Sequence, residues 1–297
     1  MKVRVGYGLG AQRGMTASGF RALVDGLETL GFDSLWLSER AGAEGPDPAI
    51  GLAVAAGRTD RIKLGTSVSV LPGRNPAILA KEIATLDVLS DGRFLPAFGL
   101  GVVHPGEQQA FGVRREERAA WFDEALPLLR RIWTEDTVDH DGPRFHYEAL
   151  RIRPHPIQRP PDVWLGGRAP AELRRVGRLG DGWLASFSTP EECATGRVVI
   201  EDAAAGAGRT IDPEHFGAMI FYAPADIPGP LRALIAARAP DTDPTEIVAT
   251  SIDAIERLVE RYVSVGFSKL VLVPMHEPPD WNAELAPLAE RILPLQT

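Results

Sequence analysis

The chain has 297 residues, of which 44% are hydrophobic and 24% charged, with a formal net charge of -8. This is the composition of a folded globular protein, and the acidic balance argues against nucleic-acid binding, which depends on clustered lysine and arginine. The single cysteine, Cys193, excludes an internal disulfide framework, and no apolar run approaches the roughly 20 residues of a membrane span. We therefore expect a cytoplasmic protein that has neither membrane nor nucleic-acid partners.

Predicted strands and helices alternate along the chain. Apolar runs predict strands, whereas apolar positions at helical spacing, preceded by a capping residue or followed by glycine, predict helices. The predicted strands are Val3–Leu9, Ser34–Leu37, Ile62–Leu71, Phe94–Leu100, Val163–Leu165, the run GDGWLAS, Phe216–Tyr222 and Lys269–Val273. The predicted helices are 20–30, Ala49–Gly57, the segment from Pro76 to about Leu86, Glu116–Trp133, 170–179 and the segment capped by Ser251.

The stretch from Ile62 to Gly101 is the clearest unit of this pattern. Two runs that are apolar at nearly every position are typical of parallel strands covered on both faces. Between them, Asn75 and Pro76 begin a helix, and Gly92 ends the turn that follows it. The unit is therefore a strand, a crossover helix and a strand.

Short returns from a helix to a strand through glycine recur four times, in LGFDSLWL, SDGRFLPA, LGDGWLAS and VGFSKLVL. Their repetition to about eight strands predicts a closed (β/α)8 TIM barrel within a single domain, 1–297. An open doubly wound sheet would alternate too, but the full phosphate-binding glycine fingerprint is missing after the first strand. Insertions are expected at about 136–161, with a hairpin at Asp141-Gly142, and at about 195–247.

Catalytic groups of a barrel lie at the C-terminal ends of its strands and in the loops that follow. That rule selects Ser38, Glu39, Arg40, Thr66, Ser67, Val68, Gly99, Gly101, His104, Gly166, Gly167, Arg168, Trp183 and Met275. Some of these admit a structural alternative: His104 can be structural, and the strand-three hydroxyls can belong to the core. No HExxH motif or cysteine cluster is present, so a metal site is not expected. The composition does not exclude a Ser-His-Asp triad, but no GxSxG elbow is present.

Two of these positions carry the sharper hypotheses. Glu39 belongs to an ion pair or a solvated loop, or it is a carboxylate that points into the barrel mouth and can bond a ring nitrogen or move a proton. The Gly166-Gly167-Arg168 loop is either a tight turn or a cradle for a phosphate, because bare amides, a helix N-terminus and a guanidinium all favour an anion.

Several runs resemble the bacterial-luciferase-like oxidoreductases: the stretch DPAIGLAVAAGRTDRIKLGTSVSVLPGRNPAILAKEIATLDVLSDGRFLPAFGLG, RPHPIQRPPDVWLGG, ELRRVGRLGDGWL and VGFSKLVLVP. The similarity covers nearly the whole chain except roughly 195–245. FDSLWLSER, GRNPA and SDGRF most resemble the branch that uses the deazaflavin coenzyme F420 in place of FMN.

The resemblance implies a homodimeric barrel with a flavin-like ring in its mouth. By position, it implies a strand-three bulge behind the ring at Ser67 and Val68, often with a non-prolyl cis peptide. It implies a ring-binding carboxylate at Glu39 and a phosphate loop at Gly166, Gly167 and Arg168. Several members carry a catalytic histidine where this chain has Arg40, which stays protonated. A proton must then come from Glu39, His104 or the substrate.

These expectations together predict an F420-dependent oxidoreductase that transfers a hydride between the deazaflavin ring and a small organic substrate. The predicted catalytic residues are Glu39 and His104, and the predicted cofactor-binding residues are Glu39, Thr66, Ser67, Val68, Gly101, Gly166, Gly167, Arg168 and Trp183. An FMN-dependent monooxygenase, a non-catalytic flavin or deazaflavin carrier, and a cofactor-free barrel lyase or isomerase remain as alternatives. The last lacks a strand-end lysine, because Lys269 begins its strand.

Overall fold

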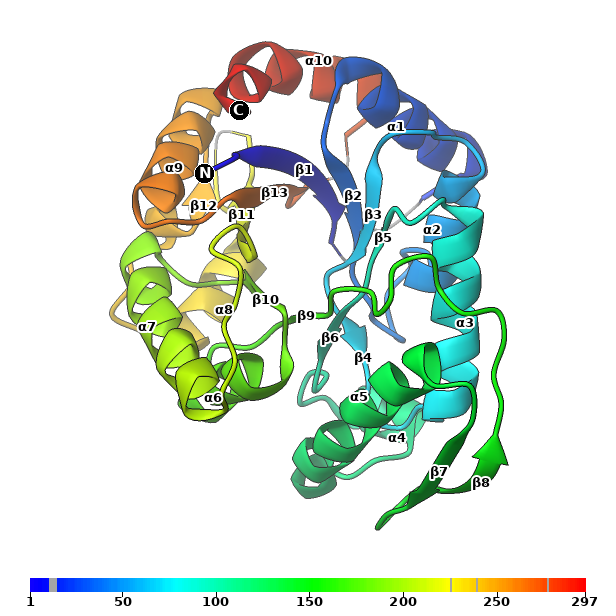
Figure 1. Ribbon diagram of the computed structural model, residues 1–297. Coiled ribbons are helices and arrows are strands. Elements are labelled where there is room, and N and C mark those ends of the chain that lie inside the picture. Colours follow the sequence, from blue (N-terminus) through cyan, green and yellow to red (C-terminus); the bar gives the residue numbers. More distant parts are fainter. Residues whose placement is uncertain (11–14, 225, 239, 277) are drawn as a thin grey trace.

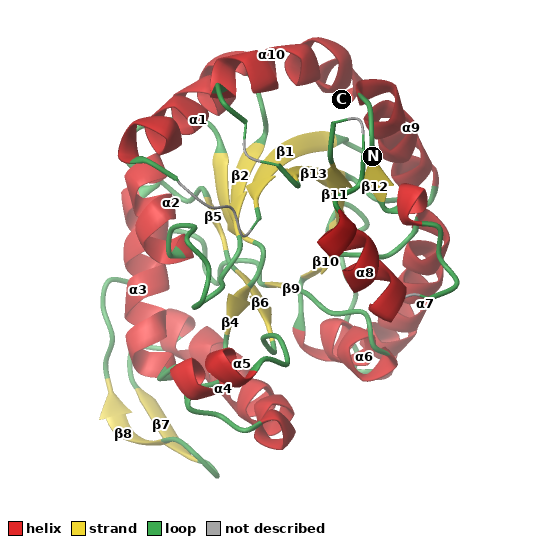
Figure 2. Cartoon of the chain, turned by 180° about the vertical axis from the view of Figure 1, so that it is seen from behind, coloured by secondary structure: helices red, strands yellow, loops and turns green. Residues whose placement is uncertain are grey.

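The computed structural model describes residues 1–10, 15–224, 226–238, 240–276 and 278–297. Its large sheet is curled, and helices cover the outer face of the curl (Figures 1 and 2). The strands are β1 (Arg4–Leu9), β2 (Ser34–Leu37), β3 (Lys63–Thr66), β4 (Ser69–Val70), β5 (Phe94–Leu95), β6 (Ala97–Gly99), β7 (Val138–Asp141), β8 (His146–Leu150), β9 (Trp164–Leu165), β10 (Gly182–Ala185), β11 (Phe216–Tyr222), β12 (Val248–Ala249) and β13 (Lys269–Pro274). The α-helices are α1 (Ala17–Leu30), α2 (Pro48–Ala56), α3 (Pro76–Leu89), α4 (Pro105–Phe111), α5 (Arg118–Thr134), α6 (Pro170–Leu179), α7 (Pro190–Gly206), α8 (Gly229–Arg238), α9 (Ile252–Ser264) and α10 (Trp281–Ile292).

The large sheet is parallel in every ladder of the described chain. Its order is β4-β6-β9-β10-β11-β13-β1-β2-β3-β5, and β12 pairs with the end of β11. The predicted α/β class with a parallel sheet is therefore confirmed. The N-terminal ends of the strands face the viewer in Figure 1, and the C-terminal ends face the viewer in Figure 2.

The predicted third and fourth strands are each broken in two. A cis peptide joins Ser67 to Val68 between β3 and β4, as the family resemblance implies, and Pro96 separates β5 from β6. The Thr66 hydroxyl bridges the second break, because it donates to the carbonyl of Ala97 (2.6 Å) and accepts from the N–H of Ala97 (2.7 Å). β4 and β6, at one end of the sheet order, thus continue the same extended segments as β3 and β5, at the other end.

Helix starts follow the predicted caps. The side chains of Asp47, Asn75 and Ser251 accept hydrogen bonds from first-turn amides of α2, α3 and α9. Such caps satisfy amides that have no partner within the helix. They fix where each crossover helix begins, and with it the length of the loop at the C-terminal end of the preceding strand.

Two tryptophans fill the inside of the curled sheet. Trp36 of β2 and Trp164 of β9 meet edge to face, with ring centroids 6.3 Å apart. Trp36 is fully buried, and a Cβ on Gly65 of the neighbouring strand would lie 2.2 Å from its ring. Only a glycine at that position leaves room for the ring, so the sheet interior is a packed core below the C-terminal ends of the strands.

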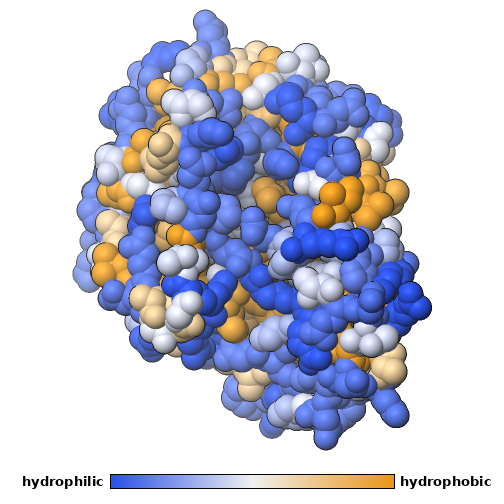
Figure 3. Space-filling view, viewed as in Figure 1, coloured by the Kyte–Doolittle hydropathy of each residue, from blue (hydrophilic) through white to orange (hydrophobic). Residues whose placement is uncertain are grey.

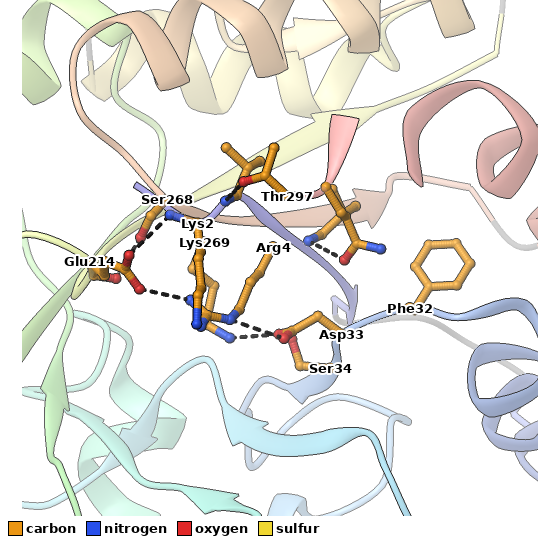
Figure 4. A network of polar contacts seen from close by, with 12 residues as sticks. Lys2, Arg4, Phe32, Asp33, Ser34, Glu214, Ser268, Lys269 and Thr297 are labelled. Atoms are coloured by element: carbon orange, nitrogen blue, oxygen red, sulfur yellow. Dashed lines mark hydrogen bonds and ion pairs between the residues drawn. The ribbon is translucent and has the colours of Figure 1, made fainter. Parts of the chain in front are cut away.

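A polar network closes the N-terminal ends of the strands (Figure 4). Lys269 at the start of β13 donates to Asp33 (2.6 Å), which precedes β2. Glu214, before β11, accepts from the backbone N–H of Lys2 (3.0 Å) and from the Arg4 guanidinium (3.3 Å). Lys269 therefore lies at the end of the barrel-like sheet opposite to the candidate site, as its position in the sequence indicates.

The two expected insertions differ in structure. The first contains the antiparallel hairpin β7–β8, which confirms the predicted turn. The segment 195–247 contains the end of α7 and all of β11, which pairs with β10 and β13, so only the part after Tyr222 departs from the strand–helix alternation.

Two further features concern the helices. Cys193 on α7 is fully buried, and burial raises the pKa of its thiol. No helix in the described ranges is both long enough and apolar enough to cross a membrane.

Candidate active site

The C-terminal ends of β2 and β3 are joined by two serines. The Ser38 hydroxyl donates to the carbonyl of Ser67 (2.9 Å) and lies 3.2 Å from the Ser67 hydroxyl. The backbone pairing continues beyond the strands, because the N–H of Ser67 donates to the carbonyl of Leu37 (2.8 Å). These contacts hold the Ser67–Val68 cis peptide at the rim of the sheet.

Val68 lies between two glycines of neighbouring strands. A Cβ on Gly99, at the end of β6, would be 2.7 Å from a Val68 methyl, and a Cβ on Gly166, after β9, would be 3.1 Å from another. Any side chain at Gly99 would therefore displace Val68. Val68 and the two glycines thus make a low, apolar step at the C-terminal ends of these strands.

Glu39 is bound on both carboxylate oxygens. One oxygen accepts from the backbone N–H of Val70 (2.6 Å), and the other pairs with the Arg74 guanidinium, which also donates to the carbonyl of Val70 (3.0 Å). Burial raises the pKa of Glu39, while the Val70 N–H and Arg74 act in the opposite direction. The carboxylate therefore ties the end of β2 to β4 and to the turn before α3, in agreement with the ion-pair alternative.

The Gly166-Gly167-Arg168 loop lies at the N-terminus of α6. The N–H groups of Arg168 and Ala169 both donate to one carboxylate oxygen of Glu172 (3.0 Å each), and Trp183 donates to the carbonyl of Gly167 (2.9 Å). An anion that binds these amides must first displace Glu172. The Arg168 guanidinium donates to the carbonyl of Phe187 (3.1 Å) and lies 3.6 Å from Glu192.

The other predicted residues, Thr66, Trp183, Gly101 and His104, make structural contacts. Thr66 bonds within the sheet, and Trp183 packs between the sheet and the helices, edge-on to Phe267 (5.6 Å). Gly101 adopts a left-handed φ of 79°, and the carbonyls at 100–102 accept from Arg118. His104 is exposed and caps α4, because its Nδ1 accepts from the N–H of Gly106 (3.2 Å).

The structure therefore brings together Ser67, Val68, Gly166 and Glu39 near the C-terminal ends of β2, β3 and β9. Sequence reasoning missed Arg74, whose partner Glu39 is 35 residues away, and Phe187, which follows β10. No spacing rule links such distant positions. Arg40, at the predicted departure from the family pattern, is exposed. No group of three or more His, Cys, Asp or Glu side chains able to hold a metal ion occurs among the described residues.

The family model for luciferase-like monooxygenases matches residues 2–239. The chain belongs to this family. Its relatives include an F420-dependent glucose-6-phosphate dehydrogenase of Microbacterium testaceum, 27% identical over 90% of both chains. The enzyme of that name from Nocardia farcinica is 32% identical over 69% of this chain, and the match spans about two thirds (65%) of its own length.

Solved structures share the fold of this chain. An F420-dependent secondary alcohol dehydrogenase in complex with an F420-acetone adduct superimposes with a TM-score of 0.82 over 100% of both chains, at 20% identity. The oxygenating constituent of 3,6-diketocamphane monooxygenase from Pseudomonas putida, in complex with FMN, gives a TM-score of 0.76 over 99% of both chains, also at 20% identity. At these identities the likeness concerns the fold alone.

Proposed function

We propose that this luciferase-like protein is a coenzyme F420-dependent oxidoreductase that transfers a hydride between the deazaflavin ring and a small organic substrate. The observation that carries the proposal is the step formed by Val68, Gly99 and Gly166 beside the cis peptide at the mouth of the sheet. The names of the relatives support F420 as the coenzyme. The proposal includes a single domain, 1–297, whose curled sheet is a closed (β/α)8 barrel. The pairings at the two ends of the sheet order, β3 with β5 and β4 with β6, support closure because the same two chain segments form both.

The chain's own residues orient the ring and exclude water. Val68 supports one face of the ring, and the Ser38–Ser67 contacts hold the peptide that carries it. Arg168 and the amides at the start of α6 hold the phosphate end once Glu172 has moved aside. When bound, F420 accepts or donates a hydride at C5 of its ring.

Proton transfer falls to His104 in this proposal. Arg74 and the N–H of Val70 occupy both oxygens of Glu39, so that this carboxylate acts by positioning β4 and Val68. The exposed His104 has Nδ1 bonded to the N–H of Gly106, which leaves Nε2 to carry the proton in the neutral ring.

Titration with each coenzyme tests the proposal. We expect the full chain to bind F420 and to reduce or oxidise it in the presence of a substrate. Tight FMN binding without F420 binding would instead support the FMN-dependent monooxygenase, which the fold of the FMN complex favours as second candidate. F420 binding with no turnover across alcohols, sugar phosphates, imines and enones would favour a non-catalytic carrier.

Opposite charges at the start of α6, Arg168 before the helix and Glu172 in its first turn, give a paired prediction. Arg168→Ala should weaken F420 binding about tenfold, because one charge-assisted contact to a phosphate contributes about 1.5 kcal/mol. Glu172→Gln, which removes a competing negative charge and keeps a capping amide, should strengthen F420 binding. Fluorescence titration measures both dissociation constants. If neither constant changes, the phosphate end binds elsewhere.

We also propose a homodimer that forms through α2 and α3. Ile50 on α2 is 68% exposed and Ile78 on α3 is 60% exposed, and Val54 is exposed beside them. Apolar side chains gather at the place where Figure 1 draws α2 (Figure 3). An apolar face on two adjacent helices is typical of the core of an interface between copies.

Sedimentation of the full chain should give the mass of a dimer. Ile50→Glu should shift the protein towards monomer, because a carboxylate buried at an apolar interface loses its hydration. Val198→Glu, at an exposed position on α7, is the matched control and should remain a dimer. A monomeric wild type would overturn this part of the proposal.

A further inference from the structure

An apolar wall lies across the mouth from Val68. In the sheet order, β6, β9 and β10 separate β4 from β11, and β13, β1 and β2 separate β11 from β3, which continues through Ser67 and Val68 into β4. Along β11, Met219 and Phe221 belong to the inner cluster with Trp36, whereas Ile220 and Tyr222 belong to the cluster under the helices. This alternation places the Phe221 ring inside the curl, at its C-terminal end.

Phe187, after β10, enlarges this wall. Its ring stacks on Phe221 with centroids 4.2 Å apart and planes 21° from parallel. Phe187 adopts a left-handed φ of 53°, which is rare for a large side chain and costs energy, so the conformation persists only where its surroundings hold it. Arg168 contributes to that hold, since it donates to the Phe187 carbonyl.

Helix α8 extends the wall over the mouth. Ile227, just before the helix, and Leu231 and Ile235 within it recur every four residues and join Phe221 and Val273 in one buried cluster. Figure 2 shows α8 at the C-terminal end of the strands, beside β10. Helical residues four apart share one face, so α8 turns a continuous apolar stripe towards the aromatic pair.

The charges beside this wall are already paired. Arg168, which the proposed function assigns to the coenzyme phosphate, contacts the Phe187 carbonyl and Glu192. Arg232 of α8 donates to Asp226 (2.7 Å) and to the carbonyl of Ile227 (3.2 Å). A sugar phosphate brings a dianion that needs a cation or several free donors. The described residues of this wall provide no cation for such a dianion.

We infer that the substrate is an uncharged, apolar alcohol, or the corresponding ketone in the reverse direction, bound against Phe187, Phe221 and α8. This inference depends on the proposed function. In the oxidation, the carbinol C–H bond of the substrate breaks and its hydride goes to C5 of the deazaflavin. The O–H proton leaves to His104, the proton carrier of the proposed function, and the carbon–oxygen double bond forms.

A substrate panel with the full chain and F420 tests the inference. Absorbance of oxidised F420 is followed with 1-phenylethanol, cyclohexanol and glucose 6-phosphate. We expect kcat/KM for the apolar alcohols to exceed that for glucose 6-phosphate about a hundredfold or more, because an unpaired dianion against an apolar wall is strongly disfavoured. Faster turnover of glucose 6-phosphate, or F420 binding without any response to apolar alcohols or ketones, overturns the inference. Absence of F420 binding overturns the proposed function instead.

A matched pair of variants on α8 tests the wall itself. Leu231→Lys places a cation on the buried stripe and should lower kcat/KM for the apolar alcohols about tenfold or more, with an unchanged dissociation constant for F420. Leu234→Lys, at an exposed position of the same helix, should leave both quantities unchanged. The F420 constant also reports that each variant is folded. Equal effects of the two variants on kcat/KM would remove α8 from the substrate site.

Discussion

Arg93→Met is expected to lower the free energy of unfolding by about 3–5 kcal/mol, because it strips partners from several buried acceptors at once. The buried guanidinium donates to the carbonyls of Ser90 (2.7 Å), Ile62 (2.9 Å), Ala56 (3.1 Å) and Thr59 (2.7 Å), and to the Thr59 hydroxyl (2.8 Å). These contacts join the start of β5 to the end of α2 and to the turn before β3. Urea unfolding followed by circular dichroism measures the loss.

Two controls accompany this prediction. Arg93→Lys should recover only part of the stability, since an ammonium has three donors and cannot reproduce the planar fork of five. Arg115→Met, at an exposed position, should change the free energy of unfolding by no more than about 0.5 kcal/mol. A loss below about 1 kcal/mol for Arg93→Met would show that water replaces the guanidinium, contrary to the expectation.

Trp36→Ala is expected to cost about 3–5 kcal/mol, the usual range for deleting a large aromatic side chain from a core. The ring is fully buried inside the sheet, contacts Trp164 edge to face, and donates from Nε1 to the Ser34 hydroxyl (2.9 Å). Little can collapse into the vacated volume, because strands surround it. Urea unfolding measures this loss too.

Gly65→Ala provides the cross-check for Trp36. Its new Cβ would overlap the indole and should cost about 1–3 kcal/mol in the wild-type background. In the Trp36→Ala background the same methyl group enters empty space, so the double variant should be more stable than the sum of the two losses predicts. Strict additivity would mean that the indole and Gly65 do not compete for the same volume.

Local patterns predicted much of the sheet because strand and helix signals depend on neighbouring residues. Ser34–Leu37 and Phe216–Tyr222 form strands with the predicted bounds, and Asn75 caps the helix it was expected to cap. The break of the third strand at Ser67–Val68 followed only from the family resemblance. Four helices escaped prediction: the short α4, α8 in the proline-rich segment, α7, which is rich in alanine and glycine, and α10, which contains Pro287.

The site was less predictable, because its contacts join positions far apart in the chain. Glu39 had two interpretations, and only the structure shows the Arg74 guanidinium on its carboxylate. The amides before α6 looked available for a phosphate, yet Glu172, four residues after Arg168, caps them. An S/T-x-x-E pattern would have indicated such a cap, but the chain has alanine at position 169, so that signal was absent.

The sealed position of Cys193 has a practical consequence for studying this enzyme. A thiol that is both inaccessible and hard to ionise does not react with maleimides, since the thiolate is the nucleophile. The native chain is thus a ready background for site-specific labelling, without prior removal of cysteines. A fluorophore on Leu234→Cys would then report, in solution, how α8 responds when coenzyme and substrate arrive.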